Sequence, residues 1–367
     1  MPDNDERWMA RALMLGRRAM GASGENPAVG CVIVAGGYPA GLGWTGEGGR
    51  PHAEPLALAM AGAAARGATA YVSLEPCAHH GRTPPCAEAL AKAGVARVVT
   101  AMEDPDPRVS GRGHAILRAA GITVEAGVLA DEARRDLAGF LSRITAGRPH
   151  VMLKLAISRD GMIAAERGRP SAITGGVSRA RVHLMRARAD AIMVGVSTVV
   201  ADDPLLTCRL PGLEQRSPVR VVSDSRLSIP LSSRLIATAG EVPVWLLATV
   251  AAPGERASAL AAAGAQIIAC KATGDGKVDL ADALHQLAAR GINRVMVEGG
   301  AHLARALIAA DLVDEAVFLT APLDLGEGGL PALAGLDRAA VTASPDFTLV
   351  DEEKLGADTL KAYERSR

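Results

Sequence analysis

The chain has 367 residues, enough for two domains of the usual size of about 100–200 residues. Hydrophobic residues make up 49% and charged residues 22%, which argues against a wholly disordered chain and allows sizeable apolar cores. Lys and Arg together number 40, as do Asp and Glu, so no net positive field favours a nucleic acid or an acidic membrane surface as a partner.

The first residues, Met1 to Arg7, lack the basic start and apolar core of a signal peptide. No uncharged apolar stretch reaches the length of about 18 residues that a transmembrane helix needs. The five cysteines are an odd number in a long chain without a signal, which favours metal binding over a disulfide framework. We therefore expect a cytoplasmic protein.

The N-terminal half alternates between helical and strand-like patterns. Residues 6–22 carry apolar side chains at helical spacing, and Asn26-Pro27 breaks this pattern. A strand is expected at 29–34, and a second one after the Gly36-Gly37 turn leads towards Gly46. The other expected helices are 52–66, 86–93 and 114–120, and the other expected strands are 70–74, 97–101 and 123–126. This alternation predicts a sheet covered by helices.

The pattern pauses at residues 145–149, TAGRP, and the domain boundary placed there gives domains 1–147 and 148–367. The second half alternates again, which predicts a second α/β domain. Its expected strands are 150–157, 190–196, 219–224, 243–248, 266–269, 293–298 and 315–320, and its expected helices are 177–188, 255–263, 279–290 and 301–310.

His52 and Glu54 open one expected helix, and Cys77 and Cys86 flank a loop at the start of another. His52, Cys77 and Cys86 as zinc ligands would leave one tetrahedral position open for water, as in catalytic sites, and bound zinc lowers the pKa of that water towards about 7. Glu54 is then the catalytic acid–base that moves a proton to the ring nitrogen and the leaving ammonia. A His-x-Glu segment followed by a Pro-Cys segment is typical of zinc-dependent nucleobase deaminases.

The spacing departs from that signature, because eight residues separate Cys77 from Cys86 where the signature has two. The alternative is two buried cysteines and a surface histidine that never meet. The order of the segments, with a strand between them, favours the zinc site. His79 and His80 could be further ligands, but histidines of a loop near the substrate are the favoured interpretation.

Residues 26–31 (NPAVGC), 52–54 (HAE) and 75–86 (EPCAHHGRTPPC) together resemble the bifunctional riboflavin-biosynthesis deaminase-reductase family, to which the long cysteine loop is specific. The resemblance implies a cytidine-deaminase-like fold of three layers for the N-terminal domain. It implies the substrate 2,5-diamino-6-(5-phosphoribosylamino)pyrimidin-4-one, which loses its 2-amino group as ammonia, and places Asn26 in the substrate pocket. Pro55 departs from the family's usual apolar β-branched residue, but proline is tolerated in the first turn of a helix.

Residues 41–46, GLGWTG, match the Gly-x-Gly-x-x-Gly pattern of dinucleotide-binding loops. Such a loop must follow a strand and open a helix, whereas residues 47–51, EGGRP, cannot form one. We therefore interpret these glycines as a strand-and-loop feature of the deaminase domain and expect the nicotinamide site elsewhere.

The resemblance continues through the second domain, where residues 154–161, 195–207 and 297–303 are similar to the family's reductase, a dihydrofolate-reductase-like fold. The pair Gly299-Gly300 after a strand would let backbone N–H groups approach a pyrophosphate at a helix N-terminus. Alone, the pair is equally compatible with a simple strand-to-helix turn. The other two matches favour cofactor binding.

The resemblance implies NADPH as cofactor of this domain and the deaminated pyrimidine as its substrate. The positions that it implies for NADPH contacts are Ala156, Thr198, Asp202, Ser225, Gly300, Ala301, His302, Leu303, Ala304, Arg305 and Ala306. The positions that it implies for substrate contacts are Arg186, Leu206, Arg209 and Glu298.

The arginines also have a physical argument, because a phosphoribosyl substrate needs cations and the Arg fork suits phosphate. For Arg186 the alternative is a solvated helix face, since Arg179, Arg181 and Arg188 lie close by in the sequence. Glu298, at the end of an apolar strand, is costly to bury unless it is paired.

Two departures from the family affect the reductase. Residues 170–174 (PSAIT) stand where relatives often have Ser-x-Trp-Ile-Thr, so Pro170 and Ala172 replace a hydroxyl and an aromatic side chain. Arg159 replaces a commonly apolar residue. We expect a locally repacked pocket and a working reductase.

The sequence thus predicts a cytoplasmic bifunctional enzyme that uses zinc to deaminate the pyrimidine and NADPH to reduce its ribosyl group to ribityl. Its partner is a small phosphoribosyl pyrimidine, with no nucleic acid and no membrane, and the resemblance implies a homo-oligomer. The main alternative is a deaminase whose C-terminal domain is inactive or only binds a ligand. A nucleic-acid-editing deaminase and a non-enzymatic zinc-stabilised module are two further alternatives.

Overall fold

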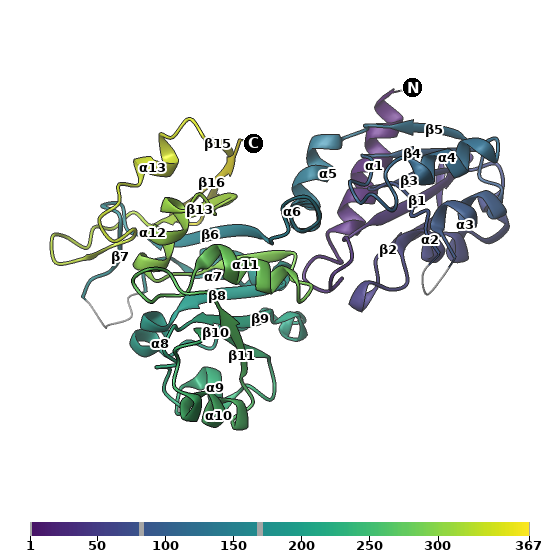
Figure 1. The fold of residues 1–367 in the computed structure, drawn as a ribbon. Helices are drawn as coiled ribbons and strands as arrows, with labels where there is room; N and C mark the ends of the chain where they lie inside the picture. The colour runs from purple at the N-terminus through teal and green to yellow at the C-terminus, as the bar shows by residue number, and fades with distance from the viewer. Residues whose placement is uncertain (1, 81–83, 167–171, 367) are drawn as a thin grey trace. The chain divides into compact units, whose positions relative to one another are not determined.

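The computed structural model describes residues 2–80, 84–166 and 172–366. Gly81 to Thr83 of the cysteine loop, and Pro170 and Ser171 of the altered reductase segment, lie outside the described residues. The chain divides into two compact units, Met1–Arg148 and Pro149–Arg367, each with its own sheet and helices (Figure 1).

The N-terminal unit is built on a five-stranded sheet in the order β2-β1-β3-β4-β5. β1 pairs antiparallel with β2 and β3, whereas β3, β4 and β5 run parallel to one another. The strands are β1 (Gly30–Ala35), β2 (Tyr38–Trp44), β3 (Thr69–Val72), β4 (Arg97–Thr100) and β5 (Thr123–Ala126).

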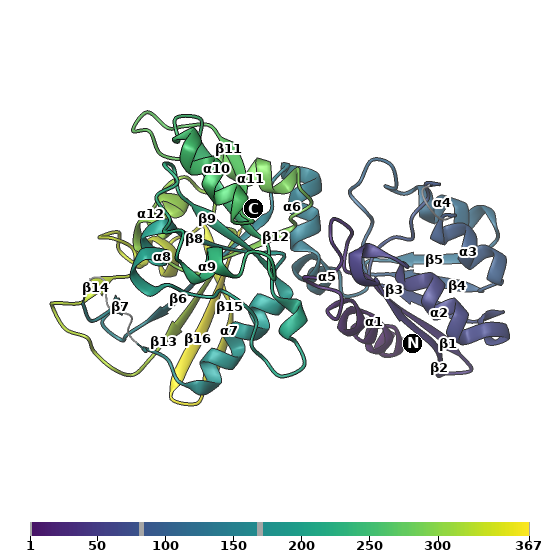
Figure 2. The same ribbon diagram turned by 90° about the horizontal axis from the view of Figure 1, so that it is seen from below.

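Helices cover both faces of this sheet, because apolar side chains point alternately to its two sides. Val32 and Tyr71 pack with α1 and α5 on one face, whereas Ile33 and Val72 pack with α2, α3 and α4 on the other. The helices are α1 (Pro2–Gly16), α2 (Ala53–Ala61), α3 (Cys86–Ala93), α4 (Arg112–Ala119), α5 (Ala130–Asp136) and α6 (Ala138–Ala146). The predicted three-layer arrangement is confirmed (Figure 2).

Glycines allow α2 to lie close against β2. A Cβ atom at Gly41 would come within 2.0 Å of the Ala57 carbonyl oxygen, and one at Gly43 within 2.1 Å of the Ala53 carbonyl oxygen. Any larger residue at either position would therefore push the helix off the sheet. Because α2 begins directly after His52, this packing also helps to place that histidine.

The C-terminal unit is built on a nine-stranded sheet in the order β11-β10-β9-β8-β12-β6-β13-β16-β15. The strands from β11 to β13 in this order are parallel, and β16 and β15 add an antiparallel edge. β7 and β14 pair separately. The strands are β6 (His150–Ile157), β7 (Met162–Ala164), β8 (Ala191–Gly195), β9 (Val219–Ser223), β10 (Val244–Thr249), β11 (Gln266–Cys270), β12 (Arg294–Val297), β13 (Glu315–Thr320), β14 (Leu330–Pro331), β15 (Phe347–Leu355) and β16 (Asp358–Arg365).

Helices cover both faces of the second sheet as well. Leu153 and Val297 pack with α11 and α12, whereas Met152 and Met296 pack with α7 on the opposite face. The helices are α7 (Gly176–Arg188), α8 (Val196–Asp202), α9 (Arg234–Ala237), α10 (Gly254–Ala262), α11 (Leu280–Ala288), α12 (Ala301–Ala309) and α13 (Ala339–Thr342). Alternation along β6 and β12 therefore turns residues 154 and 298 towards α7.

Most of the expected elements are present, and α3, β5, β6 and β13 have the expected bounds. Not predicted from the sequence were the helices α5, α6, α8, α9 and α13, the short strands β7 and β14, and the hairpin β15–β16. The middle of β15 is exposed and carries the charged residues 351–354, DEEK, so it lacks the apolar alternation of a half-buried strand. Among the described residues no helix has the length and apolar character needed to cross a membrane.

Candidate active sites

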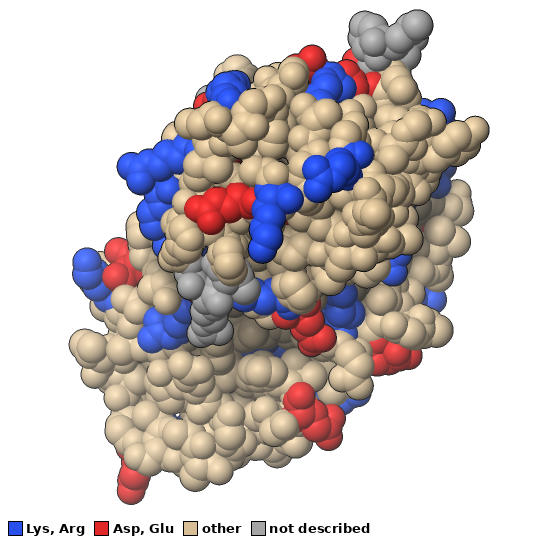
Figure 3. Space-filling model, turned by 90° about the vertical axis from the view of Figure 1, so that its right-hand side faces the viewer, with Lys and Arg blue, Asp and Glu red and all other residues tan. Residues whose placement is uncertain are grey.

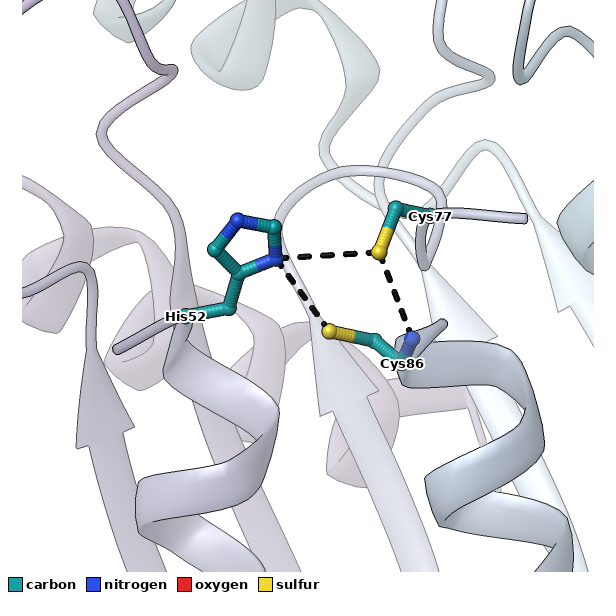
Figure 4. A group of neighbouring side chains, drawn as sticks. All are labelled: His52, Cys77 and Cys86. Atoms are coloured by element: carbon teal, nitrogen blue, oxygen red, sulfur yellow. Dashed lines mark hydrogen bonds between the residues drawn. The ribbon is translucent and has the colours of Figure 1, made fainter. Parts of the chain in front are cut away.

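Three side chains from different parts of the N-terminal unit converge at one point (Figure 4). His52 immediately precedes α2, Cys86 is the first residue of α3, and Cys77 lies in the loop between β3 and α3. His52 Nδ1 lies 3.3 Å from Cys86 Sγ and 3.7 Å from Cys77 Sγ. The alternative in which these three residues never meet is therefore wrong.

The donor set suits one zinc ion. Tetrahedral coordination, with Zn–S bonds of about 2.3 Å and Zn–N bonds of about 2.0–2.1 Å, places a nitrogen and a sulfur ligand about 3.6 Å apart. The two nitrogen–sulfur distances fall on either side of this value. Within the described part of the chain the metal-ligating group comprises His52, Cys77 and Cys86 only. Three protein ligands are the composition of a catalytic zinc site.

The loop histidines do not belong to this group. His80 Nε2 lies 3.5 Å from Glu88 Oε2, and both side chains are largely exposed. His79 is half-buried, and its Nδ1 has no hydrogen-bond partner among the described residues. The structure therefore gives no support to either histidine as a further ligand.

The start of α3 stabilises negative charge on Cys77. The Cys86 backbone N–H donates to Cys77 Sγ at 3.2 Å, and the N-terminus of a helix carries a partial positive charge. Hydrogen bonds from the Cys86 thiol and from His52 help to lower the pKa of Cys77 to about 4 in spite of burial. The hydrogen bond to Cys77, together with burial, raises the pKa of Cys86. A divalent cation between the sulfurs is what would allow both to be thiolates.

Glu54 lies in the first turn of α2 with a side chain that is only 3% exposed. Burial, followed by the negative charge of Cys77, raises the pKa of Glu54 to about 7. A carboxyl group that titrates near neutrality can both take up and return a proton. The position beside the donor set agrees with the role expected of Glu54.

Glu75 has a structural role that the sequence analysis did not assign. Its buried carboxylate accepts the backbone N–H groups of Asp104, Gly111 and His114 at 3.2, 3.0 and 3.1 Å. Because Cys77 follows two residues later, these bonds tie the main chain before this ligand to the loop that precedes α4.

Asn26 is half-buried and its amide lies directly over Gly49. A Cβ atom at Gly49 would come within 2.0 Å of Asn26 Nδ2, and the φ angle of Gly49 is +88°. Glycine is therefore required here both for the backbone conformation and for space. Gly49, the last residue of the 3-10 turn Glu47–Gly49, thus fixes where the Asn26 side chain lies.

The C-terminal unit has a cavity of about 700 Å³ at the carboxyl ends of β6, β8 and β12. In open α/β sheets, ligands bind outside the carboxyl ends of the strands. The positions expected for NADPH that line the cavity are Ala156, Thr198, Asp202, Gly300, Ala301 and His302. Gly299 and Gly300 have φ angles of +116° and +85°, so they turn the chain from β12 into α12 and leave the first N–H groups of that helix at the cavity.

The rest of the segment expected to contact NADPH leaves the cavity along α12. Leu303 and Ala304 are buried against the sheet, and Arg305 Nη1 donates to the Ala334 carbonyl oxygen at 3.0 Å. Ala306 is exposed. Successive residues of a helix face different directions, so only Gly300, Ala301 and His302 of this segment line the cavity, and the contacts of the other four residues with NADPH stay a prediction.

Ser225 and Leu206 also lie outside the cavity lining. Ser225 Oγ accepts the N–H of Val278 at 3.0 Å, which leaves its hydroxyl proton available to a ligand. The Leu206 side chain is 3% exposed and packs in an apolar core, and its φ angle is +54°. Only the main chain of Leu206 is therefore suited to contact a polar substrate.

A buried ion cluster borders the cavity. Arg186 donates from Nε and Nη2 to the Glu298 carboxylate at 2.5 and 2.8 Å, and Lys154 Nζ lies 3.7 Å from Glu298 Oε2. The side chains of Arg186 and Glu298 are 12% and 6% exposed. The alternative of a solvated Arg186 is therefore wrong, and Glu298 is paired, as its burial requires.

The cluster contains two cations and one anion, so it leaves excess positive charge beside the cavity that Lys154 and Glu298 line. Burial opposes the ionised form of Glu298, but the charges of Arg186 and Lys154 outweigh it and lower its pKa. Burial lowers the pKa of Lys154. Lys154 was not predicted as a site residue, although it is the one lysine within the apolar strand HVMLKLAI.

The two arginines expected at the substrate differ in what they can bind. The donor groups of Arg186 are engaged by Glu298 and by the Thr207 carbonyl oxygen, which accepts from Nη1 at 3.0 Å. Arg209 is exposed, and its Nη1 makes one bond, to Thr207 Oγ1 at 3.3 Å. Arg209 is therefore the one available to a phosphate.

Of the two departures, Ala172 lines the cavity, so a methyl group forms this part of its wall. Arg159 points away from it. Its side chain is exposed and pairs with Asp324, with Nε 3.0 Å from Oδ1. The change at Arg159 therefore does not alter the cavity wall.

Comparison with known proteins bears on both units. Residues 149–361 match the family described as the RibD C-terminal domain, and residues 2–102 match the cytidine and deoxycytidylate deaminase zinc-binding region. The riboflavin biosynthesis protein RibD of Escherichia coli K12 is 41% identical over 96% of this chain and 97% of its own length. The chain belongs to the RibD family. The RibD protein of Aquifex aeolicus is 38% identical over 98% of each chain.

Solved structures of the RibD family have the same fold as this chain. Acinetobacter baumannii RibD, form 1, has a TM-score of 0.87, 36% identity and full coverage of both chains. A Thermotoga maritima protein, described as a diaminohydroxyphosphoribosylaminopyrimidine deaminase/5-amino-6-(5-phosphoribosylamino)uracil reductase, has a TM-score of 0.86 and 32% identity over 100% of this chain and 99% of its own. The predicted fold class is confirmed. The chain is a bifunctional deaminase and reductase of riboflavin biosynthesis, with zinc and NADPH as cofactors.

The contact between Gly49 and Asn26 leads to a first prediction. We expect Gly49→Ala to displace the Asn26 side chain and to raise the deaminase KM by about 2- to 12-fold, the effect of one neutral hydrogen bond, while zinc stays bound. Deaminase kinetics and metal content measure this. Gly48→Ala is the control, because Gly48 also has a positive φ angle but a Cβ there meets nothing within 4 Å. Equal effects of the two variants would contradict the prediction.

Proposed function

We propose that the N-terminal unit hydrolyses the 2-amino group of 2,5-diamino-6-(5-phosphoribosylamino)pyrimidin-4-one at the site of His52, Cys77 and Cys86. The observation that carries the proposal is the buried carboxyl group of Glu54 beside a donor set of one imidazole and two thiols. The substrate is taken from the Thermotoga relative, whose description names this class of pyrimidine.

His52, Cys77 and Cys86 would hold the metal, and zinc, when bound, supplies a Lewis acid that makes water acidic near neutral pH. Glu54 takes one proton from the water at its carboxylate and returns it to the ring nitrogen, and it then takes the proton of the added hydroxyl group and passes it to the departing amine. The exchange of an amino group for a carbonyl oxygen consumes one water and releases ammonia. Asn26, held over Gly49, is suited to hydrogen-bond the heterocycle.

For the C-terminal unit we propose reduction of 5-amino-6-(5-phosphoribosylamino)uracil in the cavity at the carboxyl ends of β6, β8 and β12. NADPH, when bound, supplies the hydride. Opening the ribosyl ring also requires a proton on the released ring oxygen, and Lys154 and Glu298 form an ion pair whose two side chains line the cavity. Arg209 binds the phosphate, and Arg186 keeps Glu298 ionised and in place.

We further propose that the partner is this small phosphoribosyl pyrimidine rather than a nucleic acid or a membrane. Among the described residues on the face drawn in Figure 3, Lys and Arg side chains are interspersed with Asp and Glu instead of forming one basic surface. The balance of 40 basic and 40 acidic residues supports the same proposal. A cytoplasmic location and a homo-oligomer stay predictions. The match of 149–361 to the reductase family weighs against an inactive C-terminal unit.

Glu54→Gln should abolish deamination and retain zinc. The amide keeps the shape of the side chain, but it cannot carry the proton, and general acid–base catalysis contributes about 10²–10⁴-fold. Ammonia release and metal analysis measure the two effects, with Glu47→Gln as the exposed control in the same unit. Loss of zinc from the Glu54 variant would instead make this residue a ligand.

Cys77→Ser or Cys86→Ser should remove zinc and deaminase activity and spare the reductase, because each unit has its own core and its own site. Supplying 5-amino-6-(5-phosphoribosylamino)uracil and following NADPH oxidation tests the reductase directly. Cys31→Ala removes a buried cysteine outside the donor set and should keep zinc. Loss of NADPH oxidation in a folded Cys77 variant would show that the two sites depend on each other.

Arg209→Ala should weaken the binding of the phosphorylated substrate with little change in kcat. A hydrogen bond to a charged group contributes about 1.5–3 kcal/mol, which corresponds to a rise in KM of about 10- to 150-fold. Steady-state NADPH oxidation measures both constants, and Arg290→Ala, at an exposed residue in the turn after α11, is the control. Arg186→Ala is expected to lower kcat as well, because Glu298 loses its main partner. An unchanged KM for Arg209→Ala would remove this residue from the phosphate site.

A further inference from the structure

The segment that carries Arg209 is held by the helix α7. Arg186 Nη1 donates to the Thr207 carbonyl oxygen at 3.0 Å, and the Cys208 thiol donates to the His183 carbonyl oxygen at 3.3 Å. In the third hydrogen bond the acceptor is a side chain of α7: the backbone N–H of Arg209 donates to His183 Nδ1 at 3.2 Å. The segment belongs to no strand of the described sheets, and besides these contacts the Cys208 backbone N–H donates to Ser217 Oγ at 3.1 Å, so a few hydrogen bonds hold its main chain.

The third bond defines the state of His183. Nδ1 accepts a hydrogen bond from a backbone N–H, so it carries no proton, and the proton of the neutral ring is on Nε2. Burial and the charges of Arg186 and Arg209 lower the pKa of His183, which favours this neutral form. His183 lies one turn after Arg179 and one turn before Arg186 on α7, and Arg179 lines the cavity.

The bond is placed where it can orient the Arg209 side chain. The chain reaches Arg209 from Leu206, which is buried with a φ angle of +54°. The Arg209 guanidinium itself is exposed and makes one weak contact, to Thr207 Oγ1 at 3.3 Å. A long exposed side chain loses much rotamer freedom when it binds a phosphate. A main chain that is already fixed lowers the conformational entropy that is lost on binding.

We infer that His183 is a positioning residue for substrate binding: its Nδ1 fixes the main chain at Arg209 and so directs the guanidinium to the phosphate of the substrate. The inference rests on the proposed function of the C-terminal unit. His183 acts through Arg209, so its loss changes the binding of the phosphorylated substrate and leaves the reduction step unchanged.

Three variants of His183 distinguish the effect of a hydrogen-bond acceptor at the position of Nδ1 from the effect of a side chain that only fills the space. In His183→Asn the amide oxygen can take the place of Nδ1, so KM should stay within about 2-fold of the parent. His183→Leu has no acceptor, and in His183→Gln the amide lies one bond farther out. Both should raise KM by about 2- to 12-fold, the effect of one neutral hydrogen bond, with kcat within about 2-fold.

The experiment is NADPH oxidation by the full chain with 5-amino-6-(5-phosphoribosylamino)uracil and with the same compound lacking its phosphate. The KM effects should vanish with the second compound. His183→Leu combined with Arg209→Ala should raise KM no further than Arg209→Ala alone, because both act on one contact. His285→Leu, on the exposed face of α11, is the control.

The outcomes distinguish this inference from the proposed function. If Arg209→Ala does not raise KM, the phosphate site is elsewhere and the proposed function is wrong in this respect. If Arg209→Ala raises KM but His183→Leu does not, or if Asn behaves like Leu and Gln, the inference is overturned. If the Leu variant folds poorly, the KM values of the Asn and Gln variants decide between these outcomes.

Discussion

An ionised side chain that is buried without a partner costs several kcal/mol, and this constraint determines which residues can serve either site. Glu298 can be ionised at the cavity because Arg186 donates two hydrogen bonds to it and Lys154 lies 3.7 Å away. Because these hydrogen bonds occupy the donor groups of Arg186, this residue is not available to bind the phosphate. In the deaminase, Cys77 can be a thiolate because hydrogen bonds from Cys86 and His52 and the N-terminus of α3 stabilise it, and zinc, when bound, would stabilise it further.

The shortage of aromatic residues, 2% of the chain, has a consequence for the geometry of the zinc site. The core between α2 and β1 is filled by small side chains such as Ala53 and Ala57, so the helix must approach the sheet closely to exclude water. Gly41 and Gly43 make that approach possible. The start of α2, with His52 and Glu54, is therefore positioned by backbone-to-backbone contact, which tolerates little displacement.

Local patterns predicted most of the fold and the deaminase site. His52 and Cys86 each stand at the start of a helix, and helix starts are marked in a sequence by apolar periodicity and by glycine and proline nearby. The cysteine loop is a contiguous and specific motif. The hairpin β15–β16 was missed because its edge strand is exposed and charged, so its strand pattern comes from pairing with β16 rather than from burial.

The reductase site was less predictable because its contacts join residues that are far apart in the chain. Arg186 and Glu298 are separated by 112 positions, and nothing in either neighbourhood indicates that they pair. The bond between His183 and the Arg209 backbone depends on how a loop crosses α7, which no periodicity encodes. The segment 300–306 is a different case, since helical periodicity alone indicates that only part of it faces the cavity.

The two glycine motifs show why a pattern needs its backbone conformation before it indicates a ligand. Gly41 and Gly43 lie within the strand β2, where the missing side chains make room for a helix of the same unit. Gly299 and Gly300 both have positive φ angles between a strand and a helix, and a Cβ atom at Gly299 would meet nothing within 4 Å. In the first motif the space left by glycine is filled by the protein itself. In the second the space at Gly299 remains open beside the N-terminus of α12, where backbone N–H groups can meet an anionic group, whereas a Cβ atom at Gly300 would lie 3.3 Å from Thr198 Oγ1. The open space, and not the glycine spacing, is the feature that makes the second motif the candidate for pyrophosphate binding.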